Sequence, residues 1–131
     1  PGVKERLRSM LTSPTSVRII TTKEERYARR LLEQHGIFLP ENGVVGRGAR
    51  QSKYQTLRRY QVEFGSQARI WFVEDRLLTL QSVREHPDLD AIRLFLADWG
   101  YNTPVERKST FEERGIELLS LETFCGPFSA W

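Results

Sequence analysis

The sequence predicts an α/β fold, in which helices cover both faces of a parallel β-sheet to form a three-layer sandwich. Two observations lead to this prediction. Short apolar segments typical of strands alternate along the chain with amphipathic segments typical of helices, and this order favours parallel strands joined by helical crossovers. One strand segment, Ala68–Val73, is apolar almost throughout, as strands buried on both faces of a sheet are.

The size and composition of the chain favour one folded domain over residues 1–131. Hydrophobic residues make up 39% of the 131 residues and charged residues 28%, which excludes a disordered tail or a collagen-like chain. No apolar run has the length of a membrane span, and the one cysteine excludes an internal disulfide. We therefore expect a cytoplasmic protein with no membrane partner. The net charge of +3 comes from dispersed arginines, so nucleic acid is not the expected partner.

The first part of the chain predicts a helix, a strand and a second helix. The first helix covers Pro1–Leu11, and the strand covers Ser16–Thr21. The second helix extends from Lys23 to about His35, with Thr22 and Glu25 as its capping pair. Its apolar face is expected to comprise Tyr27, Ala28, Leu31 and Leu32.

The middle of the chain continues with a short strand, Gly43–Gly46, and a loop, Arg47–Gln51. Ser52 and Gln55 then form the capping pair of a helix that ends at Gly65. The later elements alternate in the same way, with strands at Ala68–Val73, Ile92–Ala97 and Gly115–Leu119, helices from Arg76 to Glu85 and from Thr103, and a terminal helical turn from Ser120. The sequence thus predicts five parallel strands.

Polar side chains follow two of the predicted strands at their carboxyl ends, where open parallel sheets bind ligands. Thr21 and Thr22 end the first strand, and either could donate a hydroxyl to a phosphate oxygen or cap the next helix. Glu74 and Asp75 follow Ala68–Val73. Adjacent carboxylates there suit Mg²⁺, which prefers oxygen ligands, or simply the N-terminus of the next helix, which favours acids.

Lys53 is a further candidate because it lies in the first turn of a predicted helix. A cation in that turn opposes the helix dipole by roughly a few tenths of a kcal/mol. A nearby phosphate or a pair of carboxylates would offset this cost. The alternative is a lysine that extends into water.

Taken in order, these segments resemble motifs two, three and four of the haloacid dehalogenase-like (HAD) phosphatases. The segment Ile19–Lys23 is similar to the family's strand–Thr–Asn–Lys segment, Lys53 to its motif lysine, and Trp71–Asp75 to the strand that ends in a metal-binding Asp. The loop Asp98–Asn102 resembles the Trp-Gly-Tyr loop of the phosphoglycolate phosphatase-like branch, and Pro1–Val3 resembles the Pro-Gly-Val that follows its cap domain. The likeness extends to HAD-like proteins of cyanobacteria.

The resemblance implies a Rossmann-like HAD core, Mg²⁺ as cofactor and a phosphorylated small molecule as substrate. Thr21, with Thr22 beside it, would bind the transferring phosphoryl group. Lys53 would balance charge on the nucleophile and on the phosphoryl oxygens. Asp75, with Glu74 beside it, would hold Mg²⁺. The family often has a further acid four residues after the metal-binding Asp, and a threonine, Thr79, stands there in this chain.

The family's nucleophile motif, an Asp-x-Asp on the first, central strand, is absent from residues 1–131. The chain's one Asp-x-Asp, Asp88–Asp90, precedes a predicted strand instead of following one. We therefore expect the C-terminal part of a Mg²⁺-dependent phosphatase, lacking the first central strand and not catalytic alone. An upstream segment of a longer protein or a partner chain would supply that strand, or a strand-swapped homodimer would replace it.

A non-catalytic binding or assembly module built on a degenerate HAD-like core is the alternative. Such a module would contact a partner through its arginine-rich helices and through an exposed Trp131 or Phe128. An Asp-x-Asp motif upstream of the chain would favour the phosphatase, and its absence there would favour the module.

Overall fold

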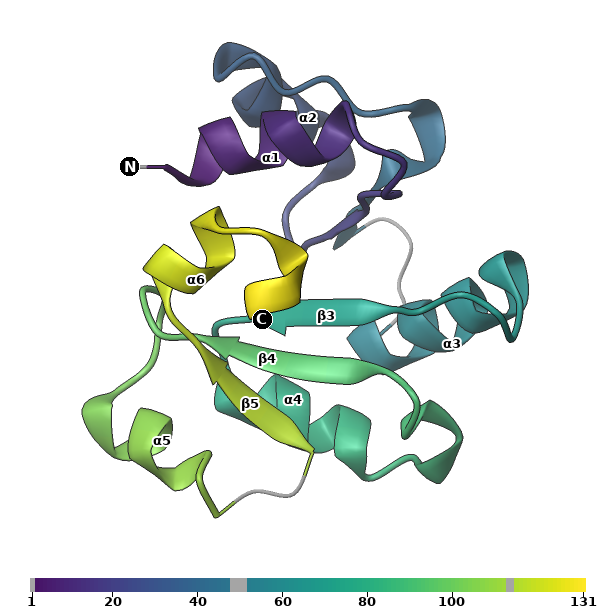
Figure 1. Cartoon of the computed structure of the whole chain (residues 1–131). Helices are drawn as coiled ribbons and strands as arrows, with labels where there is room; N and C mark the ends of the chain where they lie inside the picture. Colours follow the sequence, from purple (N-terminus) through teal and green to yellow (C-terminus); the bar gives the residue numbers. More distant parts are fainter. Residues whose placement is uncertain (1, 48–51, 113–114) are drawn as a thin grey trace. The chain divides into compact units, whose positions relative to one another are not determined.

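The computed structural model describes residues 2–47, 52–112 and 115–131, which divide into two compact units, Pro1–Gln51 and Ser52–Trp131 (Figure 1). Each unit contains one small sheet, with two strands in the first and three in the second, and all strand pairs are parallel. The predicted α/β class and the parallel direction of the strands are therefore confirmed. One continuous sheet and one domain over residues 1–131 stay predictions.

The first unit pairs two very short strands. Its elements are α1 (Val3–Leu11), β1 (Ile19–Ile20), α2 (Glu25–Gln34), a 3₁₀ turn η1 (Glu41–Gly43) and β2 (Val44–Val45). Ile19 lies opposite Val44 and Ile20 opposite Val45. The guanidinium of Arg29 donates to the carbonyl oxygens of Leu39, Pro40 and Glu41. One side chain of α2 thus holds the segment that leads into β2.

Several sequence predictions for this unit are wrong in detail, and the strand predicted over Gly43–Gly46 contains only Val44 and Val45. The strand predicted over Ser16–Thr21 contains only Ile19 and Ile20, because its partner strand is two residues long. The predicted Thr22–Glu25 capping box does not form, since Glu24 occupies the N-cap without a side-chain hydrogen bond. Tyr27 is 52% exposed, although we expected it on the buried face with Ala28.

The second unit contains a three-stranded sheet in the order β3-β4-β5. Its elements are α3 (Lys53–Phe64), β3 (Trp71–Glu74), α4 (Leu77–Arg84), η3 (Pro87–Leu89), β4 (Arg93–Ala97), α5 (Pro104–Ser109), β5 (Ile116–Leu119), α6 (Leu121–Cys125) and η4 (Phe128–Ala130). The strand predicted from Ala68 begins at Trp71, because its ladder partner β4 begins at Arg93. The loop after β2 was predicted to end at Gln51, and its last four residues lie outside the described ranges.

The central strand β4 forms the core of this unit. Leu94, Phe95 and Leu96 are each at most 1% exposed, as expected for a strand with neighbours on both edges and packing on both faces. Helix α4 covers one face, and the chain after β5 covers the other (Figure 1). Because side chains alternate along a strand, Phe95 faces that C-terminal segment, and Leu94 and Leu96 face α4.

An aromatic cluster fixes the C-terminal segment on the sheet. The ring of Trp71 lies 5.5 Å from the rings of both Phe128 and Trp131, and Phe95 also lies 5.5 Å from Trp131. The expectation that Phe128 and Trp131 are exposed contact residues is therefore wrong, since both are half-buried in this cluster. Aromatic packing of this kind buries a large apolar area.

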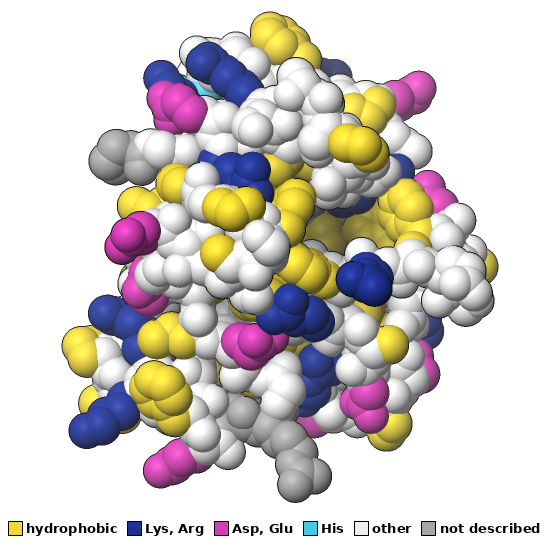
Figure 2. Space-filling view, viewed as in Figure 1, with side chains coloured by type: hydrophobic (Ala, Val, Ile, Leu, Met, Phe, Trp, Pro, Cys, Tyr) yellow, Lys and Arg dark blue, Asp and Glu magenta, His cyan; other side chains and the backbone are white. Residues whose placement is uncertain are grey.

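The surface carries mixed charge, as the dispersed arginines predict. Figure 2 shows Lys and Arg side chains scattered among acidic ones on the face in view. Ion pairs join Arg47 to Glu24 and Arg93 to Glu117. Within residues 2–47, 52–112 and 115–131, no helix combines the length and apolar character that a membrane span requires.

The predicted start and end of α3 are both confirmed. The Ser52 hydroxyl accepts from the backbone N–H of Gln55, and the Gln55 side chain accepts from the backbone N–H of Ser52. Gly65 ends the helix with a φ of 82°, in the left-handed region that glycine adopts without strain. Thr103 and Glu106 form the second predicted capping box, at the start of α5.

We predict that Ser52→Ala lowers the free energy of unfolding by about 1 kcal/mol, because it removes the N-cap acceptor of α3. Ser66→Ala, an exposed serine in the turn after the same helix, is the matched control and should change stability by less than about 0.5 kcal/mol. Urea unfolding followed by tryptophan fluorescence measures both values. Equal effects of the two substitutions would contradict the role of the cap.

Candidate functional site

The candidate site lies at the carboxyl edge of the second unit's sheet. Strand β3 ends at Glu74 and β4 ends at Ala97. Because the two strands are parallel, Asp75 and the loop from Asp98 follow at the same edge. The N-terminus of α3, with Lys53 as its first residue, also lies here, since Lys53 contacts Glu74.

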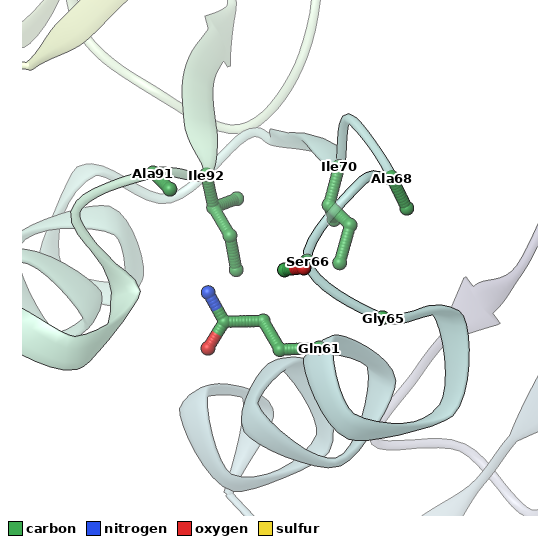
Figure 3. A pocket seen from close by; sticks show the side chains of 7 residues that line it. All are labelled: Gln61, Gly65, Ser66, Ala68, Ile70, Ala91 and Ile92. Atoms are coloured by element: carbon green, nitrogen blue, oxygen red, sulfur yellow. The ribbon is translucent and has the colours of Figure 1, made fainter.

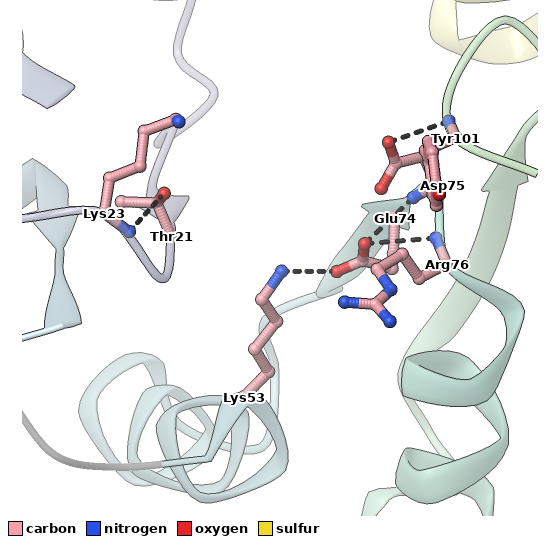
Figure 4. A network of polar contacts seen from close by, with 7 residues as sticks. All are labelled: Thr21, Lys23, Lys53, Glu74, Asp75, Arg76 and Tyr101. Carbon is pink, nitrogen blue, oxygen red and sulfur yellow. Dashed lines mark hydrogen bonds and ion pairs between the residues drawn. The ribbon is translucent and has the colours of Figure 1, made fainter.

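Lys53 and Glu74 form an ion pair with a short distance of 2.6 Å between Nζ and Oε2 (Figure 4). The Glu74 side chain is 4% exposed and that of Lys53 is 23% exposed. The other Glu74 oxygen, Oε1, accepts from the backbone N–H groups of Asp75 and Arg76 at 3.1 and 3.2 Å. Three donors therefore satisfy a carboxylate that would otherwise be buried at a cost of several kcal/mol.

The ion pair explains why a lysine is tolerated in the first turn of α3. The sequence left two possibilities for Lys53, a nearby anion that offsets its unfavourable interaction with the helix dipole or extension of the side chain into water. Glu74 is that anion. The alternative, a lysine extended into water, is wrong for this residue.

Asp75 is held by the loop that follows β4. Its Oδ2 accepts from the backbone N–H of Tyr101 at 3.0 Å, and its main-chain oxygen accepts from the side-chain amide of Asn102 at 2.9 Å. The ring of Trp99, in the same loop, packs 5.2 Å from that of Phe124. Trp99 therefore anchors the loop to α6.

The pKa of the Asp75 carboxyl is lowered from its ordinary value. Partial burial acts to raise it, but side-chain hydrogen bonding with Glu74, hydrogen bonds from the N–H groups of Tyr101 and of Asp75 itself, and the charge of Lys53 together lower the pKa further than burial raises it. Asp75 is consequently ionised at neutral pH. Lys53 thus presents an ammonium group at this edge and Asp75 a half-buried carboxylate, while the Glu74 carboxylate is buried.

Thr21 and Thr22 lie in the first unit. Thr21 follows β1 directly, and its backbone N–H donates to the main-chain oxygen of Val45 at 2.9 Å. Its hydroxyl oxygen accepts from the backbone N–H of Lys23 at 3.1 Å, and Thr22 is exposed. Since these threonines and Lys53 belong to different units, their convergence on one phosphate site stays a prediction.

Sequence reasoning missed the residues that hold Asp75 in place. The sequence identifies the loop 98–102 by its resemblance to a Trp-Gly-Tyr loop and leaves Trp99 as either a loop anchor or a wall of a phosphate cleft, but it predicts no contact for the Tyr101 amide or the Asn102 side chain. Gly100 allows this loop to approach closely, because a Cβ there would lie 2.2 Å from the Cβ of Asp75. A glycine and an asparagine just after a strand were the available signal.

The fit of this edge to a magnesium ion depends on the Asp75 carboxylate. Mg²⁺ is commonly bound through one or two carboxylates with water completing the shell, and Asp75 offers one carboxylate. Glu74 already accepts from Lys53 and two N–H groups. Thr79, half-buried in the first turn of α4, adds no carboxylate. In the described parts of the chain, no three His, Cys, Asp or Glu side chains gather as a metal cluster.

The chain's Asp-x-Asp lies away from this edge, as expected. Asp88 is in η3, before β4, and forms an ion pair with Arg58 at 2.6 Å. A shallow pocket of about 320 Å³ also lies at the amino end of the sheet, where Ile70 and Ile92 precede β3 and β4 (Figure 3). Its lining carries no charged side chain, so it does not suit a phosphate.

Comparison with protein-family models, with curated proteins and with solved structures found no match for this chain. The resemblance to the HAD phosphatases therefore stays a prediction that depends on the residues themselves.

We predict that Lys53 and Glu74 are energetically coupled. Lys53→Met leaves a buried carboxylate without its cation, and Glu74→Gln leaves a partly buried ammonium without its anion, so each variant loses stability. The double variant should recover about 1.5–3 kcal/mol relative to the sum of the two single effects, the range for hydrogen bonds to charged groups. Urea unfolding of the four proteins measures this value. Additive effects would show that the pair contributes nothing.

The lowered pKa of Asp75 predicts an acid-dependent contribution to stability. An aspartate in the unfolded chain has a pKa of about 3.9. The contribution to stability is therefore complete above that pH, and it is lost as the pH falls through the lower pKa of Asp75 in the folded state. Asp75→Asn removes the titrating group. Between about pH 5 and about pH 2, the unfolding free energy of this variant should therefore fall less than that of the wild type. Parallel pH curves from urea unfolding would contradict the assignment.

Proposed function

We propose that the chain is the C-terminal part of a Mg²⁺-dependent HAD-like phosphatase, which hydrolyses the phosphate ester of a small molecule. The Asp nucleophile comes from a strand outside residues 1–131. The observation that carries the proposal is the ion pair of Lys53 with Glu74, the residue before Asp75, at the carboxyl edge of a parallel sheet. This edge is where open α/β sheets bind their ligands.

Lys53 supplies the positive charge that phosphoryl transfer requires. Its ammonium group has three N–H donors, and Glu74 Oε2 accepts one of them at 2.6 Å. The side chain is 23% exposed, so part of it faces the solvent from which a phosphate would arrive. Catalysis of phosphoryl transfer consists mainly of positioning and charge neutralisation, and Lys53 contributes to both.

The local charge balance favours a divalent cation beside an anionic substrate. The acids at this edge, Glu74, Asp75 and Asp98, outnumber the basic residues Lys53 and Arg76. A phosphate would add further negative charge beside Asp75, which its lowered pKa keeps ionised. Bound Mg²⁺ would supply the missing positive charge, with Asp75 as its ligand and Glu74 as the residue that fixes Lys53.

The sheet offers an edge on which the missing strand could pair. In the described residues β3 is an outer strand of its sheet, and β1 is an outer strand of the other. A strand whose outer edge has no hydrogen-bonding partner tends to pair with a further strand. A segment of a longer protein, a partner chain or a swapped strand of a second copy would each satisfy the proposal if it brings an Asp to the carboxyl edge.

The proposal predicts that the chain binds Mg²⁺ through Asp75. Calorimetric titration up to millimolar Mg²⁺, with tryptophan fluorescence as a second signal, should show binding to the wild type. Asp75→Asn should weaken it at least about tenfold. Asp98→Asn is the matched control, because it removes the same charge at the end of β4 without removing the proposed ligand. No binding by the wild type, or equal losses in both variants, would overturn the metal assignment.

Hydrolysis of p-nitrophenyl phosphate by the complete protein separates the phosphatase from the binding module. An upstream Asp-x-Asp strand in its reading frame, with Mg²⁺-dependent hydrolysis that Asp75→Asn abolishes, would support the phosphatase. A complete protein without that motif and without hydrolysis would favour the module. The module would then need a contact surface other than Phe128 and Trp131, which are half-buried.

A further inference from the structure

One side chain joins the ends of two strands beside Asp75. The amide Nδ2 of Asn102 lies 2.9 Å from the main-chain oxygen of Asp75 and 2.7 Å from that of Ala97. Asp75 follows β3, and Ala97 is the last residue of β4. Because both neighbours are carbonyl acceptors, the group that faces them is the NH₂ and not the amide oxygen.

This contact continues the connection between the strands beyond the end of their ladder. The β3–β4 register ends with Glu74 opposite Leu96. One residue further along each strand, the Asn102 amide donates one hydrogen to each carbonyl. Arg107, a residue of α5, in turn donates to the main-chain oxygen of Asn102 at 3.2 Å. This hydrogen bond connects Asn102 to α5.

The loop on which Asn102 lies also carries the donor to the Asp75 carboxylate. Tyr101, the preceding residue, donates its N–H to Asp75 Oδ2 at 3.0 Å. Gly100 allows the loop to approach the Cβ of Asp75 at a distance that any side chain would obstruct. The position of the Tyr101 N–H therefore depends on Asn102, whose amide binds two main-chain oxygens, and on Gly100, which allows the close approach to Asp75.

We propose that Asn102 is a positioning residue, which fixes the Asp75 carboxylate through the Tyr101 N–H. Hydrogen-bonded partners of metal-binding carboxylates commonly set the orientation of the ligand. The orienting role concerns this chain's own contacts. Its consequence for Mg²⁺ affinity rests on the proposed function.

The test compares Asn102→Ala with two controls. Asn42→Ala makes the same chemical change at an exposed asparagine in η1. Arg84→Lys weakens contacts at the amino end of the sheet, where the Arg84 guanidinium donates to the main-chain oxygens of Leu89 and Ile92. This second control lowers stability without touching Asp75. Asn102→Ser, a smaller change, replaces Asn102→Ala if that variant fails to fold.

Two measurements distinguish an orienting role from a merely structural one. Under native conditions, amide hydrogen exchange of Tyr101, read by NMR, should accelerate at least about tenfold in Asn102→Ala. It should follow only the global loss of stability in Arg84→Lys. Mg²⁺ affinity, measured by calorimetry, should fall about tenfold in Asn102→Ala and stay at the wild-type value in both controls.

The outcomes separate the two proposals. If Tyr101 exchange does not change in Asn102→Ala beyond the change in Arg84→Lys, Asn102 is a structural residue only and the inference is overturned. If the wild type does not bind Mg²⁺, the metal assignment of the proposed function fails, and Tyr101 exchange alone decides the role of Asn102. If exchange accelerates and Mg²⁺ affinity is unchanged, Asn102 does not position a metal ligand, which also overturns the inference.

Discussion

The buried carboxylate of Glu74 is the constraint around which the second unit's sheet edge is organised. A carboxyl group at 4% side-chain exposure requires charged and polar partners. Its partners are the Lys53 ammonium and the N–H groups of the next two residues. Meeting this requirement holds the first residue of α3 against the end of β3 and fixes the turn into α4. The same contacts therefore determine where an ammonium and a second carboxylate are presented.

A functional consequence follows from the division of roles between the two adjacent acids. Glu74 is occupied in holding Lys53 and the turn, whereas Asp75 is half-buried and accepts from the loop after β4. In a phosphoryl-transfer site, Lys53 would interact with two anions at once, Glu74 and the phosphate. Such sharing keeps the ammonium oriented when no substrate is bound, and preorganised charge of this kind is what electrostatic catalysis depends on.

Local signals in the sequence identified two of the three predicted capping pairs. The Ser52–Gln55 and Thr103–Glu106 capping boxes formed as predicted, whereas Thr22 and Glu25, at the same spacing, form none because the helix begins later than predicted, with Glu24 at the N-cap. Strand limits were less accurate. β1 and β3 begin later than predicted, since the length of a strand is set by its ladder partner and not by its own apolar residues. Phe128 and Trp131 were expected to be exposed, and only the tertiary contact with Trp71 shows where their rings pack.

The sequence by itself determined the alternation of strands and helices, the parallel class of the sheets and the candidate residues Lys53, Glu74 and Asp75, because these follow from periodicity, capping and position at strand ends. Only the tertiary structure decided that Glu74 is the partner of Lys53, which lies 21 residues earlier in the chain, and that the loop carrying Tyr101 and Asn102 holds Asp75. Contacts between residues so far apart in sequence depend on how strands and helices pack. No local pattern of residues encodes that packing.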